Sequence, residues 1–519
     1  MSAPSPDSPS APAPPPAAAP APHRPPAAAE IHAAWPGPQG PLRYRAAAGW
    51  TVLFTDEKPA AEIFSVAYLV TADADADADA GGDANRRPER PVTFVFNGGP
   101  GSSSAYLQMG ALGPTRVAFP PDGRLPAMPP KLVDNDDSWL PFTDLVFIDP
   151  IGTGFSRVIP GAAAVTDGEK PEDPDAYFGY KRDLESLCEF IGRWLSAHGR
   201  WGSPIFIAGE SYGGYRVGRL VRMLQESAGV GLCGAVLISP ALEIGGLDPN
   251  DYDVLAWVDT LPTMALAAVH HGRSRAFAAG TPTETVSAAA KAFASGEFAT
   301  LLIRGAGMAA EERARILARA ADLIGLDVDL LTRAEGRIGI ETFVRELLRD
   351  ERATVGLYDA TITGPDPFPD RSRFEGPDPT LAGATPVYTA AINAQLRRVI
   401  GVETEREYHL LSYDVNAKWK NDAPEHFFSP PKGATDDLRY GMALNPHLRT
   451  FICHGRYDLV TPFASTDRLA DLMRLDPATA ARLSVRHFDG GHMFYAWETS
   501  RRAFTAAARD FYAAARPEG

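Results

Sequence analysis

Hydrophobic positions along the chain follow two different periods, which predict two kinds of secondary structure. Short runs with β-type composition, separated by turn-like breaks, lie at 42–46, 50–55 and 62–69. They predict the strands of an antiparallel meander. Further apolar runs, which alternate with helical patterns, lie at 92–96, 145–148, 205–208 and 235–239. This alternation predicts an α/β fold, a mainly parallel sheet with helices on both of its faces.

The strand-helix alternation stops in the middle of the chain and resumes near its end. From 242–442 the pattern is mostly helical, with a loop rich in Pro and Asp around 365–379. Strand patterns return at 450–453 and 484–488, before a closing helix near 496–515. We therefore predict four parts: a disordered Pro/Ala-rich tail (1–38), the first part of an α/β core (39–241), an inserted helical cap (242–442) and the last part of the core (443–519).

Charge and composition exclude several classes of partner. The chain has 50 Lys and Arg against 65 Asp and Glu, a formal net charge of −15. Such a surface repels phosphate backbones and anionic lipid, so we expect neither nucleic acid nor a membrane as a partner. No run approaches the roughly 20 apolar residues of a membrane span. With three cysteines and no apolar stretch in the tail, we expect a cytoplasmic protein. The oligomeric state stays open, with a homodimer as one option.

A glycine-rich turn after an apolar strand carries the strongest chemical signal. The run Ile205-Phe-Ile-Ala-Gly-Glu-Ser-Tyr-Gly-Gly214 leads from a strand pattern into a helix pattern. In a nucleophile elbow the turn is so tight that small residues are needed two positions either side of the serine, whose hydroxyl is then exposed above the sheet. Gly209 and Gly213 meet this need, so Ser211 is the predicted nucleophile. The alternative is a glycine-rich turn with an inert serine.

A serine hydroxyl needs a base to take its proton, and the base needs an acid to hold it in one tautomer. In the α/β-hydrolase order the acid and then the histidine follow the serine. Three histidines, His454, His487 and His492, lie beyond Arg449. His492 leaves a strand pattern through two glycines and is the predicted base, whereas His487 lies inside that pattern and is expected to be structural.

The acid should also follow a late strand. Asp458 comes just after the strand pattern that ends at Gly455, and it is the predicted acid. The alternative for Asp458 is a turn aspartate that caps the helix after Pro462. Asp489 is too close to His492 in sequence, on the wrong side of the glycine turn, to orient it.

Backbone amides are the predicted oxyanion donors. A tetrahedral intermediate needs preorganised N–H groups, one from the residue after the nucleophile and one from a glycine-rich loop after an earlier strand. The run Asn97-Gly-Gly-Pro-Gly-Ser-Ser-Ser104 follows the strand pattern at 92–96. The amides of Gly99 and Tyr212 are therefore the predicted pair.

Five blocks of sequence together resemble the serine carboxypeptidases, the family of the carboxypeptidase Y and cathepsin A type. They occur in that family's order at 97–104, 147–156, 209–214, 455–458 and 491–493. The resemblance implies an α/β-hydrolase core with a helical cap, and neither metal nor cofactor. It also implies a hydrolase that removes C-terminal residues from a peptide substrate through an acyl-enzyme on Ser211. Ser102 replaces a cysteine of many relatives, and three cysteines cannot form the disulfides of the secreted ones, so their location does not carry over.

The resemblance assigns Asn97 and Glu210 to the substrate's terminal carboxylate. Two carboxyl groups in contact cannot both be ionised, so Glu210 can fill this role only while protonated, with a pKa raised by burial and by the substrate's charge. Asn97 adds a neutral donor. The alternative is that Glu210 only fills a buried position of the elbow.

Two rival functions remain open. An esterase, or the acyltransferase branch of the family, would use the same triad, but a simple ester has no free carboxylate for Asn97 and Glu210 to bind. A non-enzymatic binding protein on a hydrolase scaffold should have lost a triad or oxyanion residue, and none of those predicted here is lost.

Overall fold

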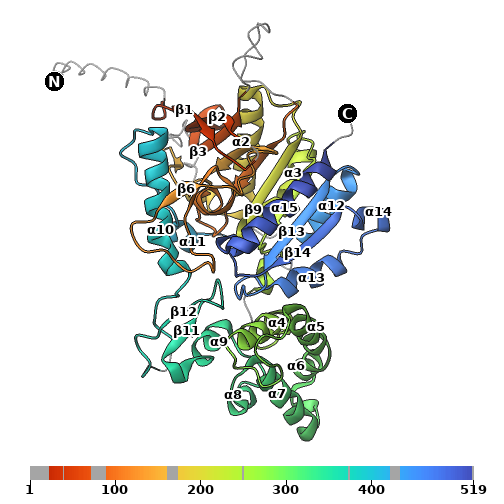
Figure 1. The fold of residues 1–519 in the computed structure, drawn as a ribbon. Helices are drawn as coiled ribbons and strands as arrows, with labels where there is room; N and C mark the ends of the chain where they lie inside the picture. Colours follow the sequence, from red (N-terminus) through yellow and green to blue (C-terminus); the bar gives the residue numbers. More distant parts are fainter. Residues whose placement is uncertain are drawn as a thin grey trace, which may run out of the picture.

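A large twisted sheet organises the chain in the computed structural model, which describes residues 23–38, 40–71, 89–159, 174–247, 250–371, 374–420 and 433–516 (Figure 1). Its first edge is the antiparallel meander of β1 (Ala29–Trp35), β2 (Leu42–Thr55) and β3 (Lys58–Val70). β3 pairs antiparallel with β7 (Asp144–Ile148) and with the short β8 (Arg157–Val158). All later neighbours pair parallel, in the order β7, β4 (Val92–Phe96), β9 (Ile205–Glu210), β10 (Gly234–Ile238), β13 (Arg449–Gly455) and β14 (Leu483–Phe488). The predicted mainly parallel sheet is confirmed.

Helices cover both faces of the sheet. One face packs against α2 (Tyr180–His198), α3 (Tyr212–Glu226) and α12 (Thr435–Leu444). The other packs against α1 (Ala105–Leu107), η1 (Gln108–Leu112), α10 (Leu381–Asn393), η7 (Ala394–Ile400) and α15 (Glu498–Ala515). Along β4, Phe94 and Phe96 pack in the hydrophobic core on the α2 and α3 face, and Val95 packs in the core on the α10 and α15 face. Burial on both sides explains why such strands read as continuous apolar runs rather than alternating ones.

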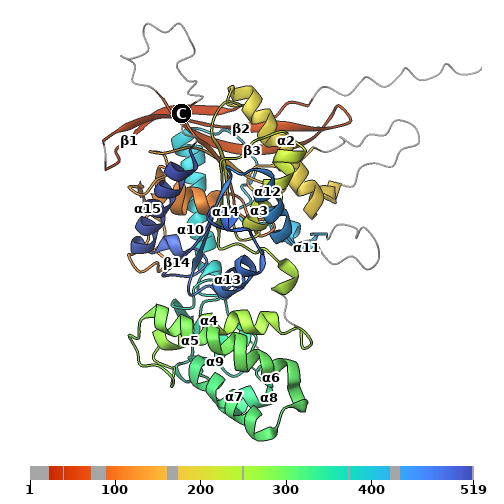
Figure 2. The ribbon, with the colours of Figure 1, turned by 90° about the vertical axis from the view of Figure 1, so that its right-hand side faces the viewer.

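A separate helical group follows β10. It comprises α4 (Leu255–His270), α5 (Thr283–Phe293), η4 (Ala294–Phe298), α6 (Ala299–Arg304), α7 (Ala310–Ile324), α8 (Val328–Arg333) and α9 (Ile340–Glu346). These helices share their own hydrophobic core, which Tyr457, Leu459 and Phe463 join from the sheet domain. Figures 1 and 2 both show this group beyond one end of the sheet, with α10 and α12 beside the sheet instead.

The structure differs from the expected boundaries in two places. α10, inside the expected cap 242–442, and α12, which begins there and ends two residues beyond it, pack on opposite faces of the sheet. Their helical periodicity does not reveal which surface they cover. β1 lies inside the expected tail 1–38: its residues before Trp35 alternate between half-buried and exposed, and that tryptophan is buried. Residues 1–22 of the expected tail lie outside the described residues.

One continuous helical segment, 283–307, is long and apolar enough to cross a membrane by length and composition. The pattern of the sequence did not indicate it, because charged residues interrupt the run. Its apolar side chains Val286, Phe293, Phe298 and Leu301 are buried in the core of the helical group. About 39% of the apolar window of this segment is buried, so one face of the segment packs on the helical group.

The remaining elements connect these layers. They are β5 (Thr115–Val117), β6 (Leu132–Asp134), η2 (Pro174–Tyr177), η3 (Ile244–Gly246), η5 (Gly305–Gly307), η6 (Arg349–Glu351), β11 (Ala353–Val355), β12 (Thr363–Pro365), α11 (Tyr413–Ala417), α13 (Phe463–Leu472), α14 (Pro477–Ala480) and η8 (Phe494–Ala496). All three cysteines are free.

Candidate active site

Ser211 lies at a sharp turn between β9 and α3. Its backbone has φ 63° and ψ −125°, a conformation that non-glycine residues rarely adopt outside functional sites. A Cβ at Gly209 would collide with the carbonyl oxygen of Gly213, and a Cβ at Gly213 would lie 2.7 Å from the carbonyl oxygen of Phe96. Side chains larger than hydrogen therefore do not fit at these positions, and the turn has the tight geometry that the sequence predicts for an elbow.

Asp458 and His492 lie in contact on the loops after β13 and β14. The Nδ1 of His492 is 2.6 Å from Oδ2 of Asp458, and both side chains are buried. The other carboxylate oxygen accepts from the backbone amides of Val460 and Thr461. The Thr461 hydroxyl lies 2.6 Å from Oδ2 of Asp458 and 3.1 Å from His492 Nδ1. These donors fix the carboxylate in the plane from which it can hold one imidazole tautomer.

The backbone of His492 is held from two further segments. Its carbonyl oxygen accepts from the hydroxyl of Ser239, and its amide donates to the carbonyl oxygen of Tyr358 at 2.5 Å. The ring of Tyr358 also meets the imidazole edge to face, with centroids 5.3 Å apart. The histidine loop is therefore fixed by residues from far along the chain.

Neighbouring carboxylates make His492 a stronger base than a free imidazole. Burial opposes the imidazolium, but the carboxylates of Asp458 and Glu210 outweigh it and raise the pKa of His492 above its ordinary value. By contrast, His487 bonds to Asp467 at 2.9 Å, and Asp489 faces Arg456. Neither of these rejected candidates contacts the pair formed by Asp458 and His492.

The glycine loop after β4 packs against the first turn of α3. A Cβ at Gly98 would collide with the amide nitrogen of Tyr212, so the two backbones approach as closely as atoms allow. Gly99 has φ +101°, which favours glycine. Beneath the loop, Asp149 accepts from the amide of Ser104 at 2.9 Å, and burial raises the pKa of this carboxyl to about 7.

Glu210 is a buried carboxyl directly beside the nucleophile. Burial raises its pKa to about 7, against the opposing effects of His492 and of hydrogen bonds from Tyr495 and Asn97. The hydroxyl of Tyr495 donates to Oε2 of Glu210 at 2.6 Å. Because Oδ1 of Asn97 already accepts from the amide of Leu107, its amide group can serve as a donor.

One pocket brings most of the predicted residues together. Asn97, Gly99, Glu210, Ser211 and His492 all line it, and it holds about 830 Å³ of empty space. Asp458 lies behind His492, outside the lining. The side chain of Tyr212 points away to Asp183, so only its backbone amide can serve the site.

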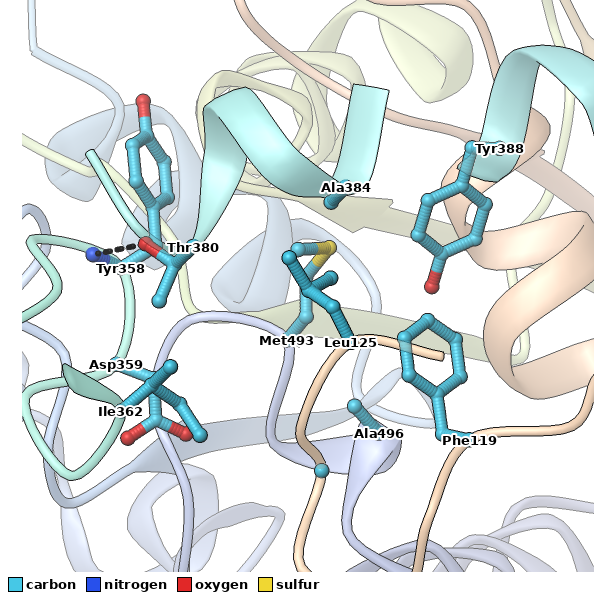
Figure 3. A pocket seen from close by; sticks show the side chains of 11 residues that line it. Phe119, Leu125, Tyr358, Asp359, Ile362, Thr380, Ala384, Tyr388, Met493 and Ala496 are labelled. Atoms are coloured by element: carbon cyan, nitrogen blue, oxygen red, sulfur yellow. Dashed lines mark hydrogen bonds between the residues drawn. The ribbon is translucent and has the colours of Figure 1, made fainter. Parts of the chain in front are cut away.

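A second, apolar pocket adjoins the first and shares Tyr358 and Met493 with it. Figure 3 shows Met493 between Leu125 and Ala384. The rings of Phe119 and Tyr388 lie on one side of it, and Tyr358 and Asp359 lie on the other. The space between these side chains is about 420 Å³, a figure that includes solvent outside the pocket.

Sequence reasoning missed four residues of the site: Tyr358, Asp359, Thr461 and Tyr495. Only Thr461 had a local signal, because a threonine three residues after an aspartate often closes a turn with it. Tyr358 and Asp359 come from a segment that no motif connects to Ser211, Asp458 or His492. Tyr495 lies three residues after His492, but no pattern in the sequence connects it to Glu210.

Comparisons with known proteins agree with the family resemblance. Residues 82–236 match the family model described as serine carboxypeptidase. The pheromone-processing carboxypeptidase kex1 of Sclerotinia sclerotiorum is 30% identical over 141 residues, which are 27% of this chain and 19% of that protein. Serine carboxypeptidase-like 13 of Arabidopsis thaliana is 26% identical over 211 residues, 40% of this chain and 41% of that protein. The chain thus spans less than half the length of these curated relatives.

A solved structure extends the likeness to the fold. The prohormone-processing carboxypeptidase Kex1 of Saccharomyces cerevisiae superposes with a TM-score of 0.50 and 16% identity, over 90% of this chain and 91% of that one. The likeness confirms the predicted α/β-hydrolase fold. The segment that contains the glycine loop and Ser211 is similar to the serine carboxypeptidases, and the fold around it is that of Kex1.

Proposed function

We propose that this chain is a serine-type carboxypeptidase that hydrolyses the C-terminal peptide bond of peptides through an acyl-enzyme on Ser211. His492 takes the hydroxyl proton as Oγ attacks the carbonyl carbon, and Asp458 holds the imidazole and stabilises the imidazolium. The amides of Gly99 and Tyr212 stabilise the oxyanion. His492 then gives the proton to the leaving amine. A water attacks the acyl-enzyme by the same route and releases the shortened peptide.

The single observation that carries the exopeptidase proposal is the place of Glu210, a buried carboxyl that lines the same pocket as Ser211 and Asn97. A substrate carboxylate that enters an enclosed site loses hydration and needs donors there. Glu210 keeps a proton up to about pH 7 because burial raises its pKa, so its carboxyl can donate one hydrogen bond. Asn97 supplies a second donor. An internal peptide bond, or a simple ester, offers no carboxylate for this pair.

The apolar pocket beyond Met493 supports a preference for the leaving residue. It lies on the Glu210 side of the site, because Ala496 lines it and the preceding Tyr495 bonds to Glu210. Its one lining carboxylate, Asp359, already accepts four hydrogen bonds from protein donors. We therefore expect a C-terminal residue with an apolar side chain to be released faster than lysine or arginine.

Matched peptides test the proposal. Purified protein is given N-terminally blocked dipeptides with free or amidated C-termini, and the released residue is measured between pH 5 and 8. We expect cleavage of the free-acid peptides and little of the amides at acidic pH. Equal cleavage of both would favour the esterase reading on the same triad. A cytoplasmic location and the lack of nucleic-acid and membrane partners stay predictions, and the oligomeric state stays open, with a homodimer as one option.

A further inference from the structure

A short segment of the inserted region, residues 357–360, lies between the two loops that carry Asp458 and His492. On one side, the amide of Leu459 donates to the carbonyl oxygen of Leu357, and the amide of Ala360 donates to that of Tyr457. On the other side, the carbonyl oxygen of Tyr358 accepts from His492. The 357–360 segment therefore connects both loops, although it comes from between β11 and β12.

Asp359 is the centre of this connection. Its Oδ1 accepts from the amide and the hydroxyl of Thr361, at 3.0 and 2.6 Å. Its Oδ2 accepts from the amide of Gly491 at 2.9 Å and from the indole nitrogen of Trp497 at 3.1 Å. A partly buried carboxylate is costly unless donors offset the lost hydration, and here four donors do so. Two of the four come from the histidine loop and from Trp497, which follows it.

The packing around this carboxylate is close. A Cβ at Gly491 would lie 2.5 Å from the Cβ of Asp359 and would collide with the carbonyl oxygen of Tyr358. Glycine is thus needed at position 491 for the histidine loop to reach the 357–360 segment. The loop can move away only by breaking the bonds to Asp359 and Tyr358 together.

We propose that Asp359 is a positioning residue that fixes the place of His492 through the amide of Gly491. The inference rests on the triad role of His492 proposed above. Asp359 follows Tyr358, whose carbonyl oxygen binds the amide of His492, and its own carboxylate binds the amide of Gly491. Without the bond to Gly491, the imidazole of His492 could shift relative to Ser211. Displacements of about 1 Å caused by remote changes can lower catalytic rates by about 10²-fold.

A graded pair of substitutions tests the role. Asp359→Ala removes every acceptor, whereas Asp359→Asn can turn its carbonyl oxygen to Gly491 and Trp497 while the Thr361 hydroxyl rotates to accept from its amide group. The matched control is Asp366→Ala. Asp366 is buried in the same inserted region, but its partners Phe368 and Arg345 belong to that region.

The readouts separate positioning from stability. Each variant is titrated for its folded, active fraction, and the rate of labelling of Ser211 by a small fluorophosphonate is measured per active site. The low-field NMR resonance of the His492 Nδ1 proton bonded to Asp458 is followed in parallel. We expect Asp359→Ala to slow labelling by about 10²-fold and to broaden the resonance, Asp359→Asn to lie between it and wild type, and Asp366→Ala to match wild type.

The proposal is overturned if Asp359→Ala is labelled as fast as wild type per active site, or if Asp366→Ala is slowed equally. If Asp359→Ala does not fold, Asp359→Asn alone decides, through its rate and its resonance. Labelling needs the nucleophile and base but no peptide carboxylate. Failure of the carboxypeptidase proposal would therefore leave this test intact, and a wild type that resists the probe would refute the triad itself.

Discussion

The two halves of the site are built in different ways. The half with Ser211 is made from two short glycine-rich runs, 97–101 and 209–214, and its shape follows from glycines at which any Cβ would meet backbone atoms. The half with His492 is assembled from separate loops, and the bond between Gly491 and Asp359 joins positions 132 residues apart. Steric necessity leaves a local pattern in the sequence, whereas hydrogen bonds between distant loops leave none. The first half is therefore readable from sequence and the second only in part.

Both halves should be equally necessary for chemistry, and removing either gives the largest expected effect. We expect Ser211→Ala and His492→Ala each to lower kcat by about 10⁶-fold, with no further loss in the double variant, because the two act as a unit. The measurement is peptide hydrolysis, with fluorophosphonate labelling lost in Ser211→Ala. His487→Ala is the control, since His487 bonds to Asp467 instead. An active His492→Ala beside an inactive His487→Ala would reassign the base.

Removal of the acid Asp458 gives the next largest expected effect and tests only the half with His492. Asp458→Ala should lower kcat by about 10⁴-fold, because the imidazole loses the partner that fixes its tautomer. Asp489, three residues from His492, pairs with Arg456 and is half-exposed, so Asp489→Ala should stay within about twofold of wild type. The comparison uses kcat at the pH optimum. A greater loss from the nearer aspartate would show that sequence distance, and not the contact in the fold, identifies the acid.

Substitution of a glycine in the elbow tests the half with Ser211 through the stability of the protein. Gly213→Ala places a Cβ 2.7 Å from the carbonyl oxygen of Phe96, so backbone must move, and we expect a loss of about 1–3 kcal/mol in the free energy of unfolding. Gly192, inside α2, has no atom within 4 Å of the same added Cβ. Gly192→Ala should therefore gain about 0.5–1 kcal/mol from helix propensity. Denaturant unfolding measures both, and equal signs would contradict the steric account of the elbow.

What could be predicted from the sequence follows the same division. The parallel strands were predicted because burial on both faces leaves apolar runs, and Ser211, Asp458 and His492 because each follows a strand. The surface that α10 covers could not be predicted, since its apolar stripe fits a sheet as well as a helical group. From the sequence, Asp359 can be expected only to close a local turn with Thr361, because its other donors, Gly491 and Trp497, become neighbours only in the folded chain. Tyr495 is similar, since only the fold places its hydroxyl on Glu210.

Glu210 belongs to the half with Ser211 by position, but its protonation depends on residues that are distant in sequence. Its substitution gives the smallest expected effect. Its pKa is raised to about 7 by burial, so the protonated form is present below that pH and is lost as pH rises through it. If that form binds the substrate carboxylate, KM for free-acid peptides should rise about tenfold between pH 6 and 8. Glu210→Gln keeps a donor at every pH and should flatten the rise, while kcat on a simple ester changes little.

Asp149 offers a matched control for this pH profile. Burial raises the pKa of its carboxyl to about 7 as well, but it lies beneath the glycine loop and not in the lining of the pocket. Asp149→Asn can still accept from the amide of Ser104, so the loop is kept and the rise in KM should remain. The rise in KM could instead persist in Glu210→Gln and disappear in Asp149→Asn. The titrating group would then act through the glycine loop, and the proposal that Glu210 binds the substrate carboxylate would be wrong.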